Sequence, residues 1–200
     1  MRAFDRHSAW LLELAAERQF PIGKLSAPDL PEQINRAGHG LVRAQIISTL
    51  AALAADGLIF LRGPDGPVAR PDESQLAAAV DEDASVRRSQ RRSYFGLTSR
   101  GGVAWESIAE PAWPRYVDAS WGTDPNEAIV TGADLACLRP WVAANIRAIS
   151  GFGAWEVVRP WPATYWKTLP LGRRLRCEHD PEDEPMLGAT VEAWYRRVQL

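Results

Sequence analysis

Residues 41–61 read LVRAQIISTLAALAADGLIFL, and this stretch says most about the fold of the first half of the chain. Its apolar residues recur at helical spacing up to Gly57, and glycine readily adopts the left-handed conformation that ends a helix. Residues 58–61, which follow, are apolar and typical of a buried strand. We therefore expect a helix, a tight turn and a strand in that order.

Two helices are expected before this stretch. Residues 5–20 repeat apolar side chains at helical spacing, and Asp5 is placed to cap the first turn. Residues 26–38 hold Ser26 and Asp29 in the spacing of a capping box, which predicts a short second helix.

After the strand, the chain is expected to return through a loop and to close with a helix. Residues 62–71 contain three prolines and predict a loop, and Asp72 after it can cap one or two helical turns. Residues 93–98 predict the returning strand, and residues 101–110 the closing helix. The inward-facing residues of that helix are expected to be Val103, Trp105, Ile108 and Ala109.

Two local motifs accompany this order of elements. The first motif is Leu50-x-x-Leu53-x-x-x-Gly57-Leu58-Ile59, at the end of the long helix. The second is Phe95-x-Leu97-Thr98-x-x-Gly101, at the end of the returning strand. In this order the two motifs resemble the winged-helix family, in particular small bacterial regulators of the multiple-antibiotic-resistance and phenolic-acid-response types. The resemblance implies a winged-helix domain over residues 1–116, with a long wing insertion of about residues 62–92.

The resemblance also implies a surface for double-stranded DNA, because the third helix of that family lies in the major groove and its wing reaches the backbone or the minor groove. Carried over to this chain, the exposed side of the third helix would present His39, Arg43, Gln45, Ser48 and Thr49. The wing would add Arg87, Arg88, Arg91 and Arg92. The candidate nucleic-acid contacts are therefore Arg43, Gln45, Ser48, Arg87, Arg88, Arg91 and Arg92.

Charge and composition leave a protein interface as an alternative to this DNA surface. The third helix carries a single basic residue, Arg43, and is otherwise rich in alanine, whereas base readout uses several long polar side chains. Residues 1–116 hold fourteen Arg plus Lys against fourteen Asp plus Glu, so the domain is neutral. The alanine-rich surface would serve equally well for packing against another helix or a second protomer.

The arginine cluster has two interpretations. As phosphate contacts, four arginines would give the affinity for DNA a clear salt dependence. Alternatively, Asp81, Glu82 and Asp83 lie just upstream and could pair with the arginines in a self-neutralising loop.

The second half of the chain differs in composition, since eight of the nine tryptophans lie from Trp105 to Trp194. We expect a smaller Trp-rich α+β domain over residues 117–200, with a short antiparallel sheet of three strands at 155–159, 164–169 and 173–178. A helix capped through Thr131 and Asp134 is expected before them, kinked or divided at Pro140. Its apolar face would comprise Leu135, Leu138, Val142, Ile146 and Ile149.

Trp161, Tyr165 and Trp166 are the candidate partner-binding residues of this domain. Aromatic side chains of this kind can stack on bases or a sugar, anchor a protein interface, or fill the core of a small domain. The sequence does not distinguish these three roles.

No motif supports an enzyme. The three histidines lie away from any serine or cysteine pattern of a nucleophilic triad, and we find neither a glycine-rich phosphate loop nor a paired-carboxylate motif. Residues 177–184, CEHDPEDE, hold thiol, imidazole and carboxylate groups, but their spacing is not that of a closed zinc site, and an acidic solvated turn is expected. We therefore predict no catalytic residue, no metal and no cofactor.

The net charge of −2, the two cysteines and the lack of a long apolar run predict a cytoplasmic protein with free thiols and no membrane contact. Together these observations predict an α+β, non-enzymatic winged-helix protein that regulates transcription by binding double-stranded DNA and is able to form a homodimer. One alternative is a protein-binding module, such as an immunity or adaptor protein, that uses the same scaffold to bind another protein. A weaker alternative is an enzyme with an unrecognised site.

Overall fold

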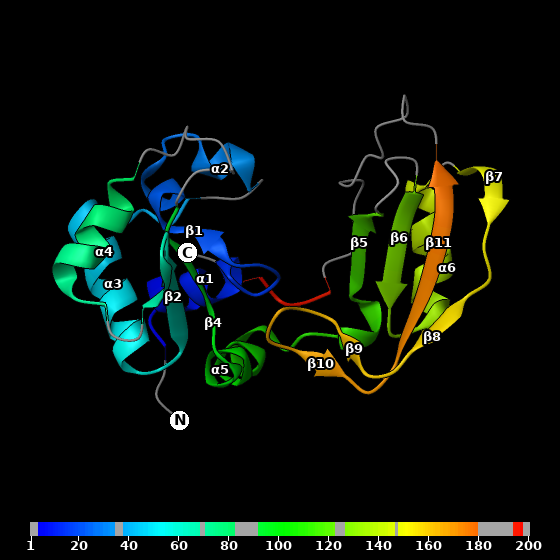
Figure 1. Ribbon diagram of the computed structural model, residues 1–200. Helices are drawn as coiled ribbons and strands as arrows, with labels where there is room; N and C mark the ends of the chain where they lie inside the picture. The colour runs from blue at the N-terminus through cyan, green and yellow to red at the C-terminus, as the bar shows by residue number, and fades with distance from the viewer. Residues whose placement is uncertain are drawn as a thin grey trace. The chain divides into compact units, whose positions relative to one another are not determined.

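The computed structural model describes residues 4–34, 38–68, 71–82, 92–122, 127–146, 148–179 and 194–197 (Figure 1). The fold is α+β, with antiparallel sheets. The chain divides into two compact units: the first comprises Met1–Ala109, Thr164–Trp166 and Arg197–Leu200, and the second comprises Glu110–Ala163 and Lys167–Arg196. The first unit therefore takes a segment from the second half of the chain.

The helices of the first unit follow the expected order, and their capping is only partly as predicted. They are α1 (Arg6–Leu14), the 3-10 turn η1 (Ile22–Ser26), α2 (Leu30–Gln33), α3 (Arg43–Ala55), α4 (Glu73–Val80) and α5 (Ser99–Ala109). Asp5 and Asp72 cap α1 and α4 as expected, because their carboxylates accept hydrogen bonds from backbone amides of the first turn. The predicted capping box of the second helix is wrong, since Ser26 belongs to η1 and Asp29 makes no capping hydrogen bond through its side chain.

The strands of the first unit form one antiparallel sheet in the order β1-β4-β2-β3. They are β1 (Phe20–Pro21), β2 (Ile59–Gly63), β3 (Gly66–Val68) and β4 (Tyr94–Leu97). The returning strand pairs with the strand after α3 as predicted, with Leu61 opposite Phe95. Residues 62–71 are not simply a loop: the chain reverses before Gly66, whose φ of +131° suits only glycine, and β2 and β3 form a hairpin.

The two sequence motifs, about forty residues apart, meet in space. Gly57 ends α3 with a φ of +67°, as expected. The Thr98 hydroxyl donates a hydrogen bond to the Gly57 carbonyl at 2.7 Å, and the Thr98 amide donates one to the Leu58 carbonyl at 3.0 Å. A Cβ added at Gly101 would lie 1.8 Å from the Leu58 oxygen, so glycine is what allows α5 to approach the backbone after α3.

Helix α5 packs against α1, but one of its predicted inward residues is wrong. Trp105 and Ala109 are fully buried, whereas Val103 is 65% exposed. Successive helical residues are rotated by about 100°, so residues two apart cannot both face the core. The inward position at this level of α5 is taken instead by the buried Gly102.

The segment Thr164–Trp166 forms part of the first unit through hydrogen bonds to its backbone. The Tyr165 hydroxyl donates to the Ala15 carbonyl at 2.6 Å and accepts from the Leu97 amide. The Trp166 indole N–H donates to the Ala16 carbonyl at 2.7 Å. Ala15 and Ala16 follow the end of α1, where carbonyls have no partner within the helix.

The Trp166 ring also packs against Trp105 and occupies the space beside Gly102 of α5. It lies edge-on to the Trp105 ring, with the ring centroids 6.0 Å apart. A Cβ at Gly102 would lie 2.0 Å from the Trp166 ring. The glycine in α5 and the aromatic side chain of the distant segment are therefore complementary.

The second unit has a larger sheet than predicted. Its elements are η2 (Trp113–Arg115), β5 (Val117–Trp121), β6 (Glu127–Gly132), α6 (Leu135–Asn145), β7 (Ala148–Phe152), β8 (Glu156–Val158), β9 (Trp161–Pro162), β10 (Thr168–Leu169) and β11 (Gly172–His179). Five strands form one antiparallel sheet, with β5-β6-β11-β7 in order and β8 also paired to β11, and β9 and β10 form a separate hairpin. The expectation of three strands is wrong in two ways. Two strands before α6 and one after it, β7, also belong to the sheet. The strand expected at 164–169 does not, since Thr164–Trp166 belong to the first unit and Thr168–Leu169 form β10 of the separate hairpin.

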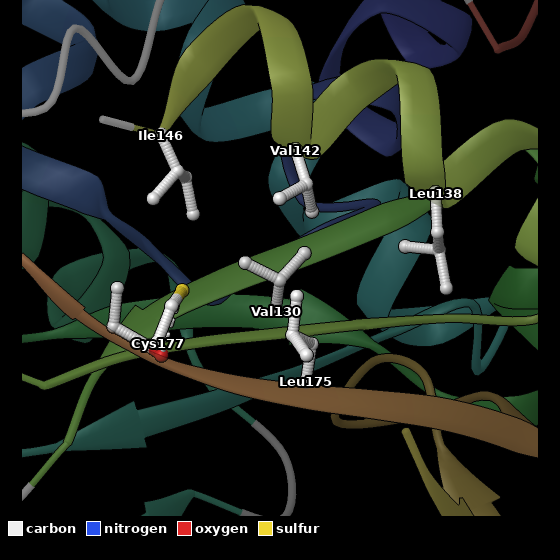
Figure 2. Packing of buried hydrophobic residues seen from close by; sticks show 7 residues of the cluster. Val130, Leu138, Val142, Ile146, Leu175 and Cys177 are labelled. Carbon is white, nitrogen blue, oxygen red and sulfur yellow. Dashed lines mark hydrogen bonds between the residues drawn. The ribbon is translucent and has the colours of Figure 1, made fainter. Parts of the chain in front are cut away.

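Helix α6 covers one face of this sheet (Figure 2). Leu138 and Val142 of α6, and Ile146 directly after the helix, point toward buried residues of β6 and β11, namely Val130, Leu175 and Cys177. Pro140 lies inside the helix without dividing it. The predicted cap through Thr131 is wrong, since Thr131 belongs to β6 and Asp134 alone caps α6, and Ile149 belongs to β7.

Candidate functional site

The three predicted contacts on α3 are on the protein surface, but the basic one is already paired. Arg43, Gln45 and Ser48 are exposed. The Arg43 guanidinium donates two hydrogen bonds of 2.6 Å to the carboxylate of Asp81, at the end of α4. These hydrogen bonds hold the pKa of the Asp81 carboxyl below its ordinary value. In the absence of a partner, Arg43 is therefore already paired with a carboxylate of its own chain.

The neighbouring polar side chains of α3 are engaged with their own helix. The Gln45 side-chain oxygen accepts a hydrogen bond from the Val42 amide at 3.0 Å, which caps the first turn. The hydroxyls of Ser48 and Thr49 donate to the Gln45 carbonyl at 3.1 and 2.7 Å. The remaining exposed positions of α3 are small, namely Ala44, Ala52 and Ala55.

The resemblance implied that His39 lies on the exposed side of the third helix, and this prediction is wrong. The His39 side chain is buried, with an exposure of 8%. One ring nitrogen lies 2.8 Å from the Leu25 carbonyl, and the other accepts a hydrogen bond from the Leu41 amide at 2.9 Å. Its ring is also edge-on to Trp10. His39 is therefore a packing residue that ties the segment before α3 to η1.

The β2–β3 hairpin, residues 59–68, has two faces of different chemistry. Neighbouring residues of a strand point to opposite faces, so Leu61 and Arg62 diverge. Leu61 is buried and lies opposite Val68, whereas Arg62 is exposed and lies opposite Tyr94. A hollow adjoins each face, and residues 62–64 border both of them.

The hollow on the Arg62 face is basic. It has a volume of about 350 Å³ and is lined by Gln19, Arg62, Gly63, Pro64, Arg92 and Tyr94. Two guanidinium groups, an amide and a phenol therefore border one concave surface. Such a set of hydrogen-bond donors suits a phosphate group. We call this surface the basic hollow.

The hollow on the Leu61 face is apolar with an acidic wall. It has a volume of about 480 Å³ and lies between the hairpin and α4, with Gln75, Ala78 and Ala79 of α4 in its lining. The Glu82 carboxylate accepts hydrogen bonds from the amide and the hydroxyl of Ser93, at 2.7 and 2.5 Å. We call this cavity the α4 pocket.

The predicted arginine cluster falls mostly outside the described residues. Arg87, Arg88 and Arg91 belong to residues 83–91, which are not described, and Arg92 borders the basic hollow. Asp81, which one of the two interpretations made a partner for the cluster, pairs with Arg43. The pairing places the end of α4 beside the start of α3.

The candidate partner-binding aromatics are engaged in packing. Trp161 is 2% exposed, and its ring stacks on Tyr116 with centroids 6.1 Å apart. Trp166 and the Tyr165 hydroxyl bond to backbone groups of the first unit, although Tyr165 remains 38% exposed. Of the three possible roles, the geometry of Trp161 and Trp166 corresponds to core packing.

Cys177 and the acidic turn after it were the remaining sequence candidates for a ligand set. Cys177 is buried beneath α6, its thiol lies 3.5 Å from the Ala128 carbonyl, and burial raises the pKa of that thiol. Residues 180–184 of the acidic turn lie outside the described part of the chain. Within the described residues, no three His, Cys, Asp or Glu side chains gather as a metal site would require. In the same residues, no helix combines the length and the apolar character needed to cross a bilayer.

Sequence reasoning missed Arg62, Glu82 and Ser93, which border the two hollows. Arg62 lies in a stretch that we predicted to be a loop, so its strand partner and its face could not be assigned. The bond between Glu82 and Ser93 spans eleven residues and depends on where α4 returns to the sheet. Alternation along the apolar strand could have indicated that Arg62 points away from the core.

Comparisons with known proteins add no further constraint: this chain matches neither a family model, nor a curated protein, nor a solved structure.

Proposed function

We propose that the first unit is a winged-helix domain and that the protein is a non-enzymatic regulator that binds double-stranded DNA. The fold proposal is supported by the order of α1, α2, α3, β2, β3, β4 and α5 and by the contact between the two motifs at Leu58 and Gly101. On this proposal α3 is the recognition helix and the β2–β3 hairpin is the wing.

The basic hollow is the observation that carries the DNA proposal. Arg62 and Arg92 converge on it from β2 and from the residues before β4. In the sequence, Arg87, Arg88 and Arg91 directly precede Arg92 and extend the run of positive charge. We propose that these arginines contact phosphates of the DNA backbone on the side of the wing.

Helix α3 is proposed to contribute less than the wing does. Arg43 must exchange its bond with Asp81 for one with DNA, and alanines occupy much of the exposed surface. The side-chain NH2 of Gln45 and the acceptor lone pairs of the Ser48 hydroxyl oxygen remain available to base edges, because the Gln45 oxygen and the Ser48 hydroxyl proton are bonded within α3. We therefore expect affinity to be dominated by phosphate contacts, with weak preference for sequence.

Fluorescence anisotropy with a labelled mixed-sequence duplex, titrated over a range of salt concentrations, tests this proposal. The plot of log affinity against log salt has a negative slope, and Arg62→Ala combined with Arg92→Ala should make it shallower by roughly 1.8. That is about 0.9 for each phosphate that the variant no longer neutralises. The matched control is Arg139→Ala, an exposed arginine on α6, which should leave the slope unchanged. Failure of the wild-type protein to bind at low salt would rule the DNA proposal out.

A second candidate function, binding of a protein partner through α3, is favoured by one observation. The exposed surface of α3 is small and nearly uncharged, with Ala44, Ser48 and Ala52 in line and Val42 exposed by 64% beside them. Ser48→Arg separates the two candidates. A bulky cation there should strengthen nonspecific DNA binding, whereas it should abolish a close-packed protein interface.

A further inference from the structure

The α4 pocket has the size and the lining of a small-molecule site. Its volume of about 480 Å³ falls within the roughly 300–1,000 Å³ usual for such sites. Half of its described lining residues have apolar side chains: Leu61, Pro64, Pro67, Val68, Pro71, Ala78 and Ala79. Three of these residues are prolines, whose rings fix the backbone φ angle.

Glu82 supplies the charge inside this lining. Its carboxylate is held by two hydrogen bonds from Ser93, and each carboxylate oxygen can accept a further bond. The backbone of Glu82 packs closely against η1, since a Cβ added at Gly23 would lie 2.5 Å from the Glu82 carbonyl oxygen. Among the described residues, no Lys or Arg forms an ion pair with Glu82.

Among the described lining residues of the pocket, the basic one is Arg62. Arg62 borders the pocket, but its side chain points to the opposite face of the hairpin from Leu61. Asp65, at the hairpin turn, adds a second carboxylate to the lining. The described lining therefore favours a cation over an anion.

From this geometry we propose that the α4 pocket binds a small apolar molecule that carries a protonated amine. The apolar body occupies the space between Val68 and Ala79, and the ammonium group donates a charge-assisted hydrogen bond to Glu82. This site is separate from the basic hollow and does not depend on DNA binding.

A set of three probes of similar shape tests the proposal on the full chain at pH 7. They are 2-phenylethylamine, 2-phenylethanol and 3-phenylpropionate, each titrated while amide proton and nitrogen chemical shifts are recorded. The amine should shift the amides of Val68, Gln75 and Ala79 in a saturable way, with an affinity about tenfold higher than that of the alcohol. The carboxylate should bind more weakly still.

Three variants complete the test. Glu82→Gln keeps the size of the side chain and should lower the affinity for the amine about tenfold, with no change for the alcohol. Asp65→Asn removes an exposed charge nearby and should change the affinity for the amine less than about threefold. Ala78→Trp fills the pocket from an exposed position of α4, leaves the bond between Glu82 and Ser93 in place, and should abolish binding of all three probes.

Equal affinity for the amine and the alcohol would overturn the proposal that the ligand carries a protonated amine. Chemical shifts that persist in Ala78→Trp, or that map away from the hairpin and α4, would overturn the site. Because Ala78→Trp does not alter Glu82, the site remains testable even if Glu82→Gln unfolds.

Discussion

At the scale of single residues, Tyr165 shows how one hydroxyl can satisfy two distant parts of the backbone. It donates to the Ala15 carbonyl, just after α1, and accepts from the Leu97 amide, at the end of β4. Only the protonated phenol can do both, since a phenolate has no proton to donate. Burial of this group raises the pKa of Tyr165 above its ordinary value.

Stability should therefore fall at high pH because of Tyr165. Its pKa is near 10 in the unfolded chain and higher in the folded protein, so its contribution is complete below pH 10 and is lost as the pH rises toward the folded pKa. Between about pH 10 and 12, the free energy of unfolding should decline by up to about 1.4 kcal/mol per pH unit through this group. Urea unfolding at a series of pH values measures the decline.

Tyr165→Phe should remove this part of the pH dependence and lower stability by about 1–3 kcal/mol at pH 7, because two backbone groups lose their partner. Tyr94→Phe is the matched control, since Tyr94 lies at the start of β4 at the margin of the basic hollow. If the free energy of unfolding of Tyr165→Phe declined with pH as steeply as that of the wild type, the decline could not be assigned to Tyr165.

At the scale of elements, α6 retains a proline in its interior and still forms a single helix. Pro140 lies at an exposed position, while Leu138 and Val142 on either side of it are buried against the sheet. A proline lacks the amide proton that would bond to the carbonyl four residues earlier. Burial of the apolar face outweighs this loss, so of the two predicted outcomes, a kink or a division, the division does not occur.

Pro140→Ala should stabilise the second unit by about 1–3 kcal/mol, because it restores one helical hydrogen bond at an exposed site. Amide hydrogen exchange in α6 measures the gain locally, and urea unfolding followed by tryptophan fluorescence measures it globally. Arg139→Ala, at the adjacent exposed position, should change stability by less than about 0.5 kcal/mol. A destabilised Pro140→Ala variant would mean that the helix is adapted to the proline ring.

At the scale of the whole molecule, the first unit is not a continuous stretch of chain. We expected a domain of residues 1–116, whereas the first unit includes Thr164–Trp166. Two carbonyls after α1 and the space beside Gly102 are occupied by this segment. A fragment that ends at residue 116 therefore exposes Trp105 on one side and leaves those carbonyls without their partners.

A fragment of residues 1–116 should be less stable than the first unit of the intact chain by at least about 3 kcal/mol, comparable to loss of a buried aromatic side chain. Urea unfolding of the fragment, compared with hydrogen exchange of the same residues in the full chain, gives the difference. A peptide of residues 161–169 added in trans should raise its melting temperature. The same peptide with Trp166→Ala should not. Equal stability of fragment and intact unit would refute this prediction.

Several elements could be predicted from the sequence because their causes are local. Asp5 and Asp72 begin α1 and α4, Gly57 ends α3, and the apolar runs mark β2 and β4. In these cases a cap, a left-handed glycine or a periodic pattern acts within a few residues. The errors at Ser26 and Thr131 arose where a capping pattern occurred in a segment that other contacts hold in a different structure.

The candidate site was less predictable. Arg43, Gln45 and Ser48 lie on the surface of α3 as expected, yet neither the pairing of Arg43 with Asp81 nor the hollow bordered by Arg62 and Arg92 was foreseen. Side chains that are far apart in the sequence meet only after strand register and helix packing are set. A one-residue shift in β2 would send Arg62 to the opposite face.

Local periodicity and capping were sufficient to specify the α+β class and the order of α1, α2, α3, β2, α4, β4 and α5. Three features emerged only from the folded chain: Thr164–Trp166 completes the first unit, α4 pairs with α3 through Arg43, and the hairpin separates a basic hollow from an apolar pocket. Those features depend on contacts between residues up to 150 positions apart, and such contacts are selected by shape, register and hydrogen-bonding partners that no local pattern encodes.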